Sequence, residues 1–264
     1  MQCTMGDEVK AAAGRQCVWG LLACAFRYPD AEMTQTLSDP ARRLELRSAT
    51  GHLAERHSAT RMRLLRHLRG AGRSSVETLQ ESYGRLFGHA VRGQCPPYEL
   101  EYGRRDIVQQ APELADIVGF YTAFGLEIGA ASHERADHVS VECEFMSVLA
   151  MKEAWAESVG DEAGLETIRS AQRAFLADHL GRWFPAFARR VAQADGRGFF
   201  GSLAAFGLDF IGDECEQCEA PRGSSHLQLA PAEIQEDAGI SCGSRECGSG
   251  SAREELVPLR IDGT

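Results

Sequence analysis

Two tyrosines and a glutamate stand close together after a pair of prolines, and their types suit the recognition of a peptide. Tyr98, Glu99 and Tyr102 follow the Pro-Pro pair at residues 96–97. Paired prolines disfavour a helix, and binding residues often lie on such irregular segments. Tyrosine rings supply apolar walls with a polar edge, and a carboxylate supplies a fixed hydrogen-bond acceptor. The segment therefore predicts one wall of a peptide-binding groove.

A second cluster of charged residues leads into an apolar helical pattern. Glu134, Asp137 and His138 stand immediately before residue 139, where the pattern continues. Aspartate is a favoured helix N-cap, so a structural role is predicted for Asp137. An imidazole beside a carboxylate can also act as a tuned acid or base, or contact an anion. A helical hydrolase that uses Asp137 and His138 is one hypothesis, although no Gly-x-Ser-x-Gly, phosphate-loop or dinucleotide-binding motif supports it.

Four cysteines in the last fifty residues form two pairs. Two residues separate Cys215 from Cys218, and four separate Cys242 from Cys247. Four thiolates can hold zinc or an iron–sulfur cluster, and the first spacing is common in metal sites. The Gly-rich, acidic surroundings suit a flexible metal-binding loop. The other interpretation is a reduced tail that binds no metal. A metal-binding or redox-sensing protein is therefore a second functional hypothesis.

Composition divides the 264 residues into a body and an acidic tail. Residues 213–264 hold eleven acidic residues and four arginines, so they carry −7 of the net charge of −10. They are rich in Gly, Ser and Pro and have few large apolar residues, which predicts a flexible tail. The overall composition excludes collagen, a wholly disordered chain and a small disulfide scaffold. We therefore expect one domain over residues 10–212 and a tail over residues 213–264.

One stretch of the body is strongly basic. Residues 42–73 contain nine arginines and two acidic residues, a net charge of +7. Such a stretch attracts an acidic partner, or it forms a solvated helix face. Because no nucleic-acid-binding motif or interleaved aromatic residues accompany it, we expect no nucleic-acid partner.

Apolar residues recur at helical spacing through most of the body. The pattern predicts helices at 11–28, 112–125, 137–156 and 165–192, with a further apolar seam at 199–210. Pro112 suits the first turn of its helix, and Pro185 marks a kink or a new start. The sequence has no convincing alternation of apolar and polar residues that would indicate strands. The predicted fold class is all-α, with a single helical bundle.

The sequence also predicts the cellular compartment. No run of about 18 apolar residues is present, so no membrane-spanning helix is expected. The first ten residues have no apolar core typical of a secretion signal. Nine cysteines are an odd number, and several lie in apolar helical patterns, which favours reduced thiols. We therefore expect a cytoplasmic protein without membrane insertion.

Four short motifs follow one another along the body. They are Tyr83-x-x-Leu86-Phe87; Pro97-Tyr98-Glu99-x-x-Tyr102; Glu134-x-x-Asp137-His138 with Glu142-x-Glu144-Phe145-Met146; and Phe175-x-x-x-His179-x-x-x-Trp183-x-Pro185-x-Phe187. In this order and at these distances, they resemble the TorD/DmsD/NarJ family of molybdoenzyme chaperones. The resemblance covers about residues 15–212 and leaves the cysteine-bearing tail outside the common pattern.

The resemblance implies an all-helical cytoplasmic chaperone that performs no turnover of its own. Such proteins bind the N-terminal leader, often a twin-arginine leader, of the catalytic subunit of a molybdopterin oxidoreductase. They hold the apo-subunit until the molybdenum cofactor is inserted. The expected leader-binding residues are Tyr98, Glu99, Tyr102, Glu134, Asp137 and His138, with Glu99 and Asp137 accepting hydrogen bonds from leader arginines. His179 and Trp183 are expected to pack a helix junction.

Overall fold

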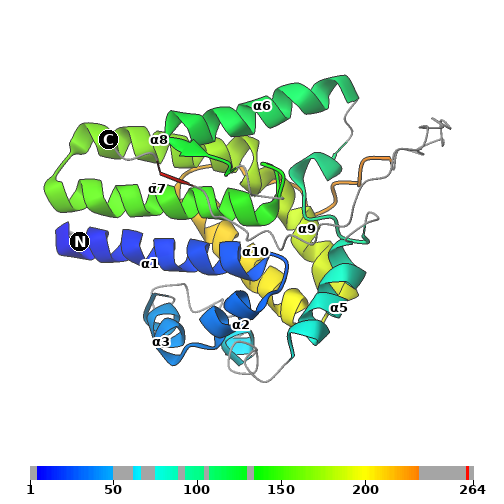
Figure 1. Cartoon of the computed structure of the whole chain (residues 1–264). Coiled ribbons are helices and arrows are strands. Elements are labelled where there is room, and N and C mark those ends of the chain that lie inside the picture. Colours follow the sequence, from blue (N-terminus) through cyan, green and yellow to red (C-terminus); the bar gives the residue numbers. More distant parts are fainter. Residues whose placement is uncertain are drawn as a thin grey trace, which may run out of the picture.

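The computed structural model describes residues 5–49, 62–66, 75–88, 93–103, 107–129, 134–231 and 260–261. This part of the chain is mostly helical, so the all-α prediction is confirmed (Figure 1). The α-helices are α1 (Met5–Ala25), α2 (Ala31–Ser38), α3 (Pro40–Ala49), α5 (Val76–Phe87), α6 (Ile107–Ala123), α7 (Val139–Val159), α8 (Glu162–Asp178), α9 (Leu180–Ala194) and α10 (Phe199–Gln217). A 3₁₀ turn, η3, covers Glu99–Glu101, and two short strands, β1 (Leu126–Glu127) and β2 (Arg260–Ile261), pair antiparallel.

Helices α1 and α7 form the centre of the bundle. They run antiparallel along most of their length, and α1 lies between α7 and the shorter α2 and α3 (Figure 1). Large apolar side chains of both helices are completely buried, among them Trp19 and Leu22 of α1 and Phe145 and Leu149 of α7. Burial of such side chains is the main favourable contribution to the stability of the bundle.

The junction between α8 and α9 differs from the sequence prediction. One helix is predicted over 165–192 with a kink or new start at Pro185, but α8 ends at Asp178 and α9 starts at Leu180. Pro185 therefore lies inside α9, where it cannot donate to the carbonyl of Gly181. That carbonyl instead accepts a hydrogen bond from the amide of Gly223, at 3.0 Å. The proline is tolerated because a distant segment supplies the missing donor.

Two further boundaries also shift. Helix α6 begins at Ile107, so Pro112 lies in its interior rather than in its first turn. Helix α10 runs to Gln217, so the compositional boundary after residue 212 falls inside a helix. The chain then continues along the body to residue 231, where the amide of Ala230 donates to the carbonyl of Glu101, at 2.8 Å. Ordered structure therefore extends into the region that composition assigns to the tail.

In the described part of the chain, none of the helices combines the length and the apolar character that crossing a membrane requires.

Candidate functional site

Five of the six residues expected to bind a leader meet where the 93–103 segment joins the start of α7. Tyr98 and His138 form an antiparallel backbone bridge. The amide of Glu99 donates to the carbonyl of Asp137, at 2.9 Å, and the amide of Val139 donates to the carbonyl of Pro97, at 2.8 Å. The two sequence motifs are therefore held together through their backbones.

Asp137 holds this junction from inside the protein. Its side chain is completely buried, and Oδ2 accepts a hydrogen bond from the amide of Leu100, at 3.2 Å. Arg135 donates to both carboxylate oxygens, at 2.9 and 2.8 Å. Burial raises the pKa of Asp137, while Arg135 and the Leu100 amide oppose that rise. The carboxylate expected to receive a leader arginine is thus already bound to an arginine of this chain.

His138 caps α7 in place of Asp137, so the predicted N-cap is wrong by one residue. The carboxylate of Asp137 is engaged by Leu100 and Arg135, whereas Nδ1 of His138 accepts from the amide of Ser140, at 3.2 Å. Burial, reinforced by the positive charge of Arg135, lowers the pKa of His138 to about 3. An imidazole with so low a pKa is a weak base, and the ring is completely buried, so the geometry at His138 adds no support to the hydrolase hypothesis.

Glu99 forms a second buried ion-paired group, opposite Asp137. Its carboxylate lies 3.2 Å from Nδ1 of His179 and also bonds the guanidinium of Arg182. Burial alone would lower the pKa of His179, but the hydrogen bond and charge of Glu99, with Asp116 at 3.3 Å from Nε2, raise it instead. Glu99 therefore joins the segment before α6 to the start of α9, and His179 packs the helix junction as expected.

Glu142 is a third buried carboxyl group, near enough to Glu99 and Asp137 to interact with both, and its importance was not predicted from the sequence. Its side chain is completely buried, and Oε2 accepts from the indole of Trp183, at 2.9 Å. Oε1 has no hydrogen-bond partner among the described residues. Burial and the neighbouring carboxylate of Glu99 raise the pKa of Glu142 well above its ordinary value, which favours the protonated form of this side chain.

Tyr102, the remaining expected residue, belongs to the core. Its ring is completely buried and lies 5.3 Å from the ring of Trp183, and its hydroxyl donates to the carbonyl of Pro96, at 3.0 Å. Tyr102 therefore packs inside the protein beneath the 93–103 segment and does not form the predicted groove wall.

The accessible part of the junction is a small rim made by Tyr98, Glu134 and Arg135. The Tyr98 hydroxyl donates to Glu134, at 3.4 Å, and the guanidinium of Arg135 lies over the Tyr98 ring, 4.8 Å from its centre. Tyr98 is half-buried, and the side chain of Glu134 is 22% exposed. The sequence analysis selected Tyr98 and Glu134 but missed Arg135. Its position two residues before Asp137 was the one indication that it could pair with that carboxylate.

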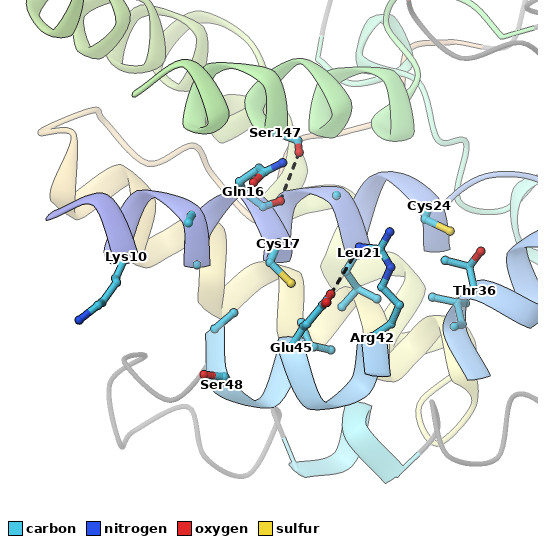
Figure 2. A pocket seen from close by; sticks show the side chains of 16 residues that line it. Lys10, Gln16, Cys17, Leu21, Cys24, Thr36, Arg42, Glu45, Ser48 and Ser147 are labelled. Atoms are coloured by element: carbon cyan, nitrogen blue, oxygen red, sulfur yellow. Dashed lines mark hydrogen bonds and ion pairs between the residues drawn. The ribbon is translucent and has the colours of Figure 1, made fainter. Parts of the chain in front are cut away.

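A groove of about 690 Å³ lies on another face of the bundle (Figure 2). Its floor is the side of α1 that carries small residues, including Gly14, Cys17 and Gly20. Leu37 of α2 and Leu46 of α3 form one wall, and Ser147 of α7 lies on the other side, where it donates to the carbonyl of Gln16.

Both apolar and charged side chains line the groove. Burial raises the pKa values of the Cys17 and Cys24 thiols, which keeps both uncharged. Lys10 lies at one end of the groove, and Arg42 extends from α3 toward α1 beside Leu21; both side chains are strongly exposed, and Arg42 pairs with Glu45 at 3.5 Å (Figure 2). Cavities of this size and character are typical of binding sites for other molecules. None of the leader-binding residues expected from the sequence lines it.

The expected metal ligands fall into two groups. Cys215 lies buried in α10 and Cys218 follows the helix end; burial raises their pKa values to about 11 and 12. Cys242 and Cys247 lie outside the described residues. Over the residues that the structure describes, no three His, Cys, Asp or Glu side chains are grouped closely enough to hold a metal ion.

Comparison with known proteins gives consistent matches. A family model described as "Nitrate reductase delta subunit" matches residues 51–189, more than half of the chain. A protein of Vibrio cholerae named "Chaperone protein TorD" is 28% identical over 187 residues, which cover 70% of this chain and 78% of that protein. The "Perchlorate reductase assembly chaperone protein" of Dechloromonas aromatica is 27% identical over 226 residues, covering 81% and 96%. The "Selenate reductase assembly chaperone protein" of Thauera selenatis is 32% identical over 127 residues, covering 45% and 60%.

Proposed function

We propose that this chain, which belongs to the nitrate reductase delta subunit family, is a cytoplasmic assembly chaperone. Its client is the catalytic subunit of a molybdopterin oxidoreductase. The chaperone binds the N-terminal leader of that subunit and holds the apo-protein while the molybdenum cofactor is inserted. It acts by binding and performs no turnover. The named functions of its relatives support the class of partner.

The arrangement of the motif residues supports binding at the rim. Glu99, Asp137 and His138 are buried and paired, so they fix the backbone that presents Tyr98 and Glu134. A rigid, pre-formed surface binds a peptide with a smaller entropic cost than a flexible one. The single observation that carries the proposal is this partly exposed Tyr98–Glu134 pair, which rests on the buried, ion-paired residues Glu99 and Asp137.

Arg135 indicates how a leader arginine would be recognised. Its guanidinium lies 4.8 Å from the centre of the Tyr98 ring, which is the geometry of a cation–π contact. A leader arginine can take the same kind of position on the exposed part of the ring, where the carboxylate of Glu134 offers a hydrogen-bond acceptor. Apolar leader residues would then contact the ring edge.

The proposal is tested by identifying the client and measuring its leader. Tagged chain is isolated from its own cells, the bound reductase subunit is identified by mass spectrometry, and the leader peptide of that subunit is titrated calorimetrically. We expect stoichiometric binding that Glu134→Gln weakens by about tenfold, as for one charge-assisted hydrogen bond worth about 1.5 kcal/mol. Glu166→Gln, the same change at an exposed site on α8, leaves the affinity unchanged. Failure to recover a molybdopterin subunit, or an unchanged affinity in Glu134→Gln, contradicts the proposal.

A further inference from the structure

The chain that follows α10 returns over the body and reaches the segment that carries the candidate site. Residues 219–231, here called the strap, follow the end of α10 and are drawn in orange in Figure 1. Near the end of the strap, Leu227 and Leu229 are half-buried, while Gln228 between them is exposed. Alternation of this kind is typical of a β-strand that lays one face on a surface. The end of the strap is therefore built like an added strand.

The end of the strap pairs with residues 101–103 through the backbone. Two hydrogen bonds of 2.8 Å run from the amide of Gly103 to the carbonyl of Gln228 and from the amide of Ala230 to the carbonyl of Glu101, and Tyr102 and Leu229 form an antiparallel bridge. Such bonds do not depend on the side chains of the strap, so another extended peptide can form them. The same short segment begins with Tyr98, which belongs to the accessible rim. The paired edge and the rim are therefore parts of one continuous piece of chain.

Little buried surface holds the strap in place. Within residues 219–231, all of which the structure describes, Ala230 alone is buried. The side-chain bonds of the strap lie near the surface: Arg222 donates to the carbonyl of Leu208, at 3.0 Å, and Arg189 donates to the carbonyl of Ser225, at 3.5 Å. A segment with few buried apolar contacts and many exposed bonds opens at a lower free-energy cost than the helices of the core.

The strap comes very close to the body at Gly223. The amide of Gly223 donates to the carbonyl of Gly181, at 3.0 Å, and a Cβ at position 223 would overlap the carbonyl group of Arg182. Because that carbonyl is part of the backbone of α9, no rotation of a side chain relieves the overlap. Arg182 also pairs with Glu99, so the strap rests directly on the buried ion pair beneath the candidate site. An alanine at position 223 should therefore unseat the strap.

We propose that the edge at residues 101–103 binds an extended segment of the client, which adds as a strand and displaces the strap. The preferred segment carries apolar side chains at alternate positions, as the strap does at Leu227 and Leu229. This inference rests on the proposed function, because a leader held at Tyr98 and Glu134 brings its neighbouring residues to this edge. The strap is an internal competitor that keeps the edge paired until a client arrives.

Amide hydrogen exchange, resolved by NMR on the full chain, follows the two sides of the pairing separately. The probe is the N-terminal peptide of the client subunit isolated with the chain, covering the leader and the residues that follow it. Adding the peptide should speed exchange of the Ala230 amide by about tenfold or more, while the Gly103 amide stays slow because the peptide supplies a new carbonyl. A peptide that binds while the Ala230 amide remains protected overturns the inference and leaves the proposed function intact.

Substitutions in the strap measure the competition. Gly223→Ala should tighten peptide binding by about tenfold, the change expected when the fraction of chains with an open strap rises from about one tenth to nearly one. Leu229→Asp, which puts a charge on the half-buried face, should act in the same direction without a backbone clash. Gln228→Asp at the exposed neighbouring position and Gly84→Ala, where a Cβ meets open space, should leave the affinity unchanged. Equal affinities in all these chains overturn the inference.

The unseated chain also shows where the peptide lies. Thermal melting of Gly223→Ala should remain cooperative, because the strap packs on α9 and α10 and not between α1 and α7. Without peptide, the Gly103 amide of this variant should exchange faster than in the parent chain, and added peptide should slow it again. Peptide that binds without slowing this amide occupies another surface and overturns the inference. Absence of binding to both the parent chain and Gly223→Ala contradicts the proposed function, and this inference with it.

Discussion

Replacing Glu142 by glutamine should change how the stability of the protein depends on pH. Glu142 is completely buried, bonds the indole of Trp183 and has its pKa raised by burial and by Glu99. Because the pKa is higher in the folded than in the unfolded state, the folded protein keeps a proton that the unfolded chain has lost. The stabilising contribution is therefore complete below the unfolded pKa and is lost as the pH rises toward the folded pKa.

The magnitude follows from one retained proton. Each pH unit in this window lowers the free energy of unfolding by about 1.4 kcal/mol. Glu214 acts with the same sign, because burial raises its pKa to about 7, so its contribution changes between its ordinary pKa of 4.5 and that value and totals about 3 kcal/mol. Comparison of Glu142→Gln with the parent chain isolates the effect of Glu142, because Glu214 is present in both.

Urea denaturation at a series of pH values measures the effect. A glutamine at position 142 can still accept from Trp183, and its amide can donate toward Glu99, so the variant should fold. We expect the unfolding free energy of the parent chain to fall more steeply with pH than that of Glu142→Gln, by about 1.4 kcal/mol per unit. Glu166→Gln, at an exposed position, serves as the matched control. Parallel curves for parent and Glu142→Gln would refute a protonated Glu142.

Three other substitutions or measurements probe the core and the thiols. Phe206→Ala should lower the free energy of unfolding by about 3–5 kcal/mol, because the ring is buried; a smaller loss in urea titrations would remove Phe206 from the core. Trp183→Phe should cost about 1–3 kcal/mol, because the carboxyl of Glu142 loses its donor, and an unchanged midpoint would contradict that bond. Cys215 and Cys218 should react with a thiol reagent at neutral pH much more slowly in the folded chain than in urea, since both pKa values are high; equal rates would contradict their burial.

Sequence periodicity predicted the long helices because their apolar faces are buried against neighbours along most of their length. It failed at the α8–α9 junction because Pro185 is compensated by Gly223, whose amide comes from a distant segment. Gly181 at the same junction also depends on tertiary packing, because a Cβ at this position would lie 2.9 Å from Sγ of Cys215. Such compensation depends on tertiary contacts and leaves no local pattern.

The sequence motifs identified residues that the fold brings together, but they did not predict the contacts of those residues. The motif order correctly brought Tyr98, Asp137 and His138 to one place. Residue types alone could not show that Asp137 forms an ion pair with Arg135. Nor could they show that Glu99 forms an ion pair with Arg182, which is more than eighty residues away in the sequence. The groove was not predicted, because the small residues of α1 form no distinctive sequence pattern. They line a groove only because α2 and α3 pack beside α1.

The central claim is that this chain assists the loading of a molybdopterin oxidoreductase. The most direct measurement is the molybdenum content of the client reductase, purified from cells with and without the chain. We predict that the reductase subunit made without the chain contains little molybdenum, and that the parent chain restores it fully, while a chain carrying Tyr98→Ala and Glu134→Gln restores it poorly. A reductase that is fully loaded with molybdenum in cells lacking the chain would contradict the account.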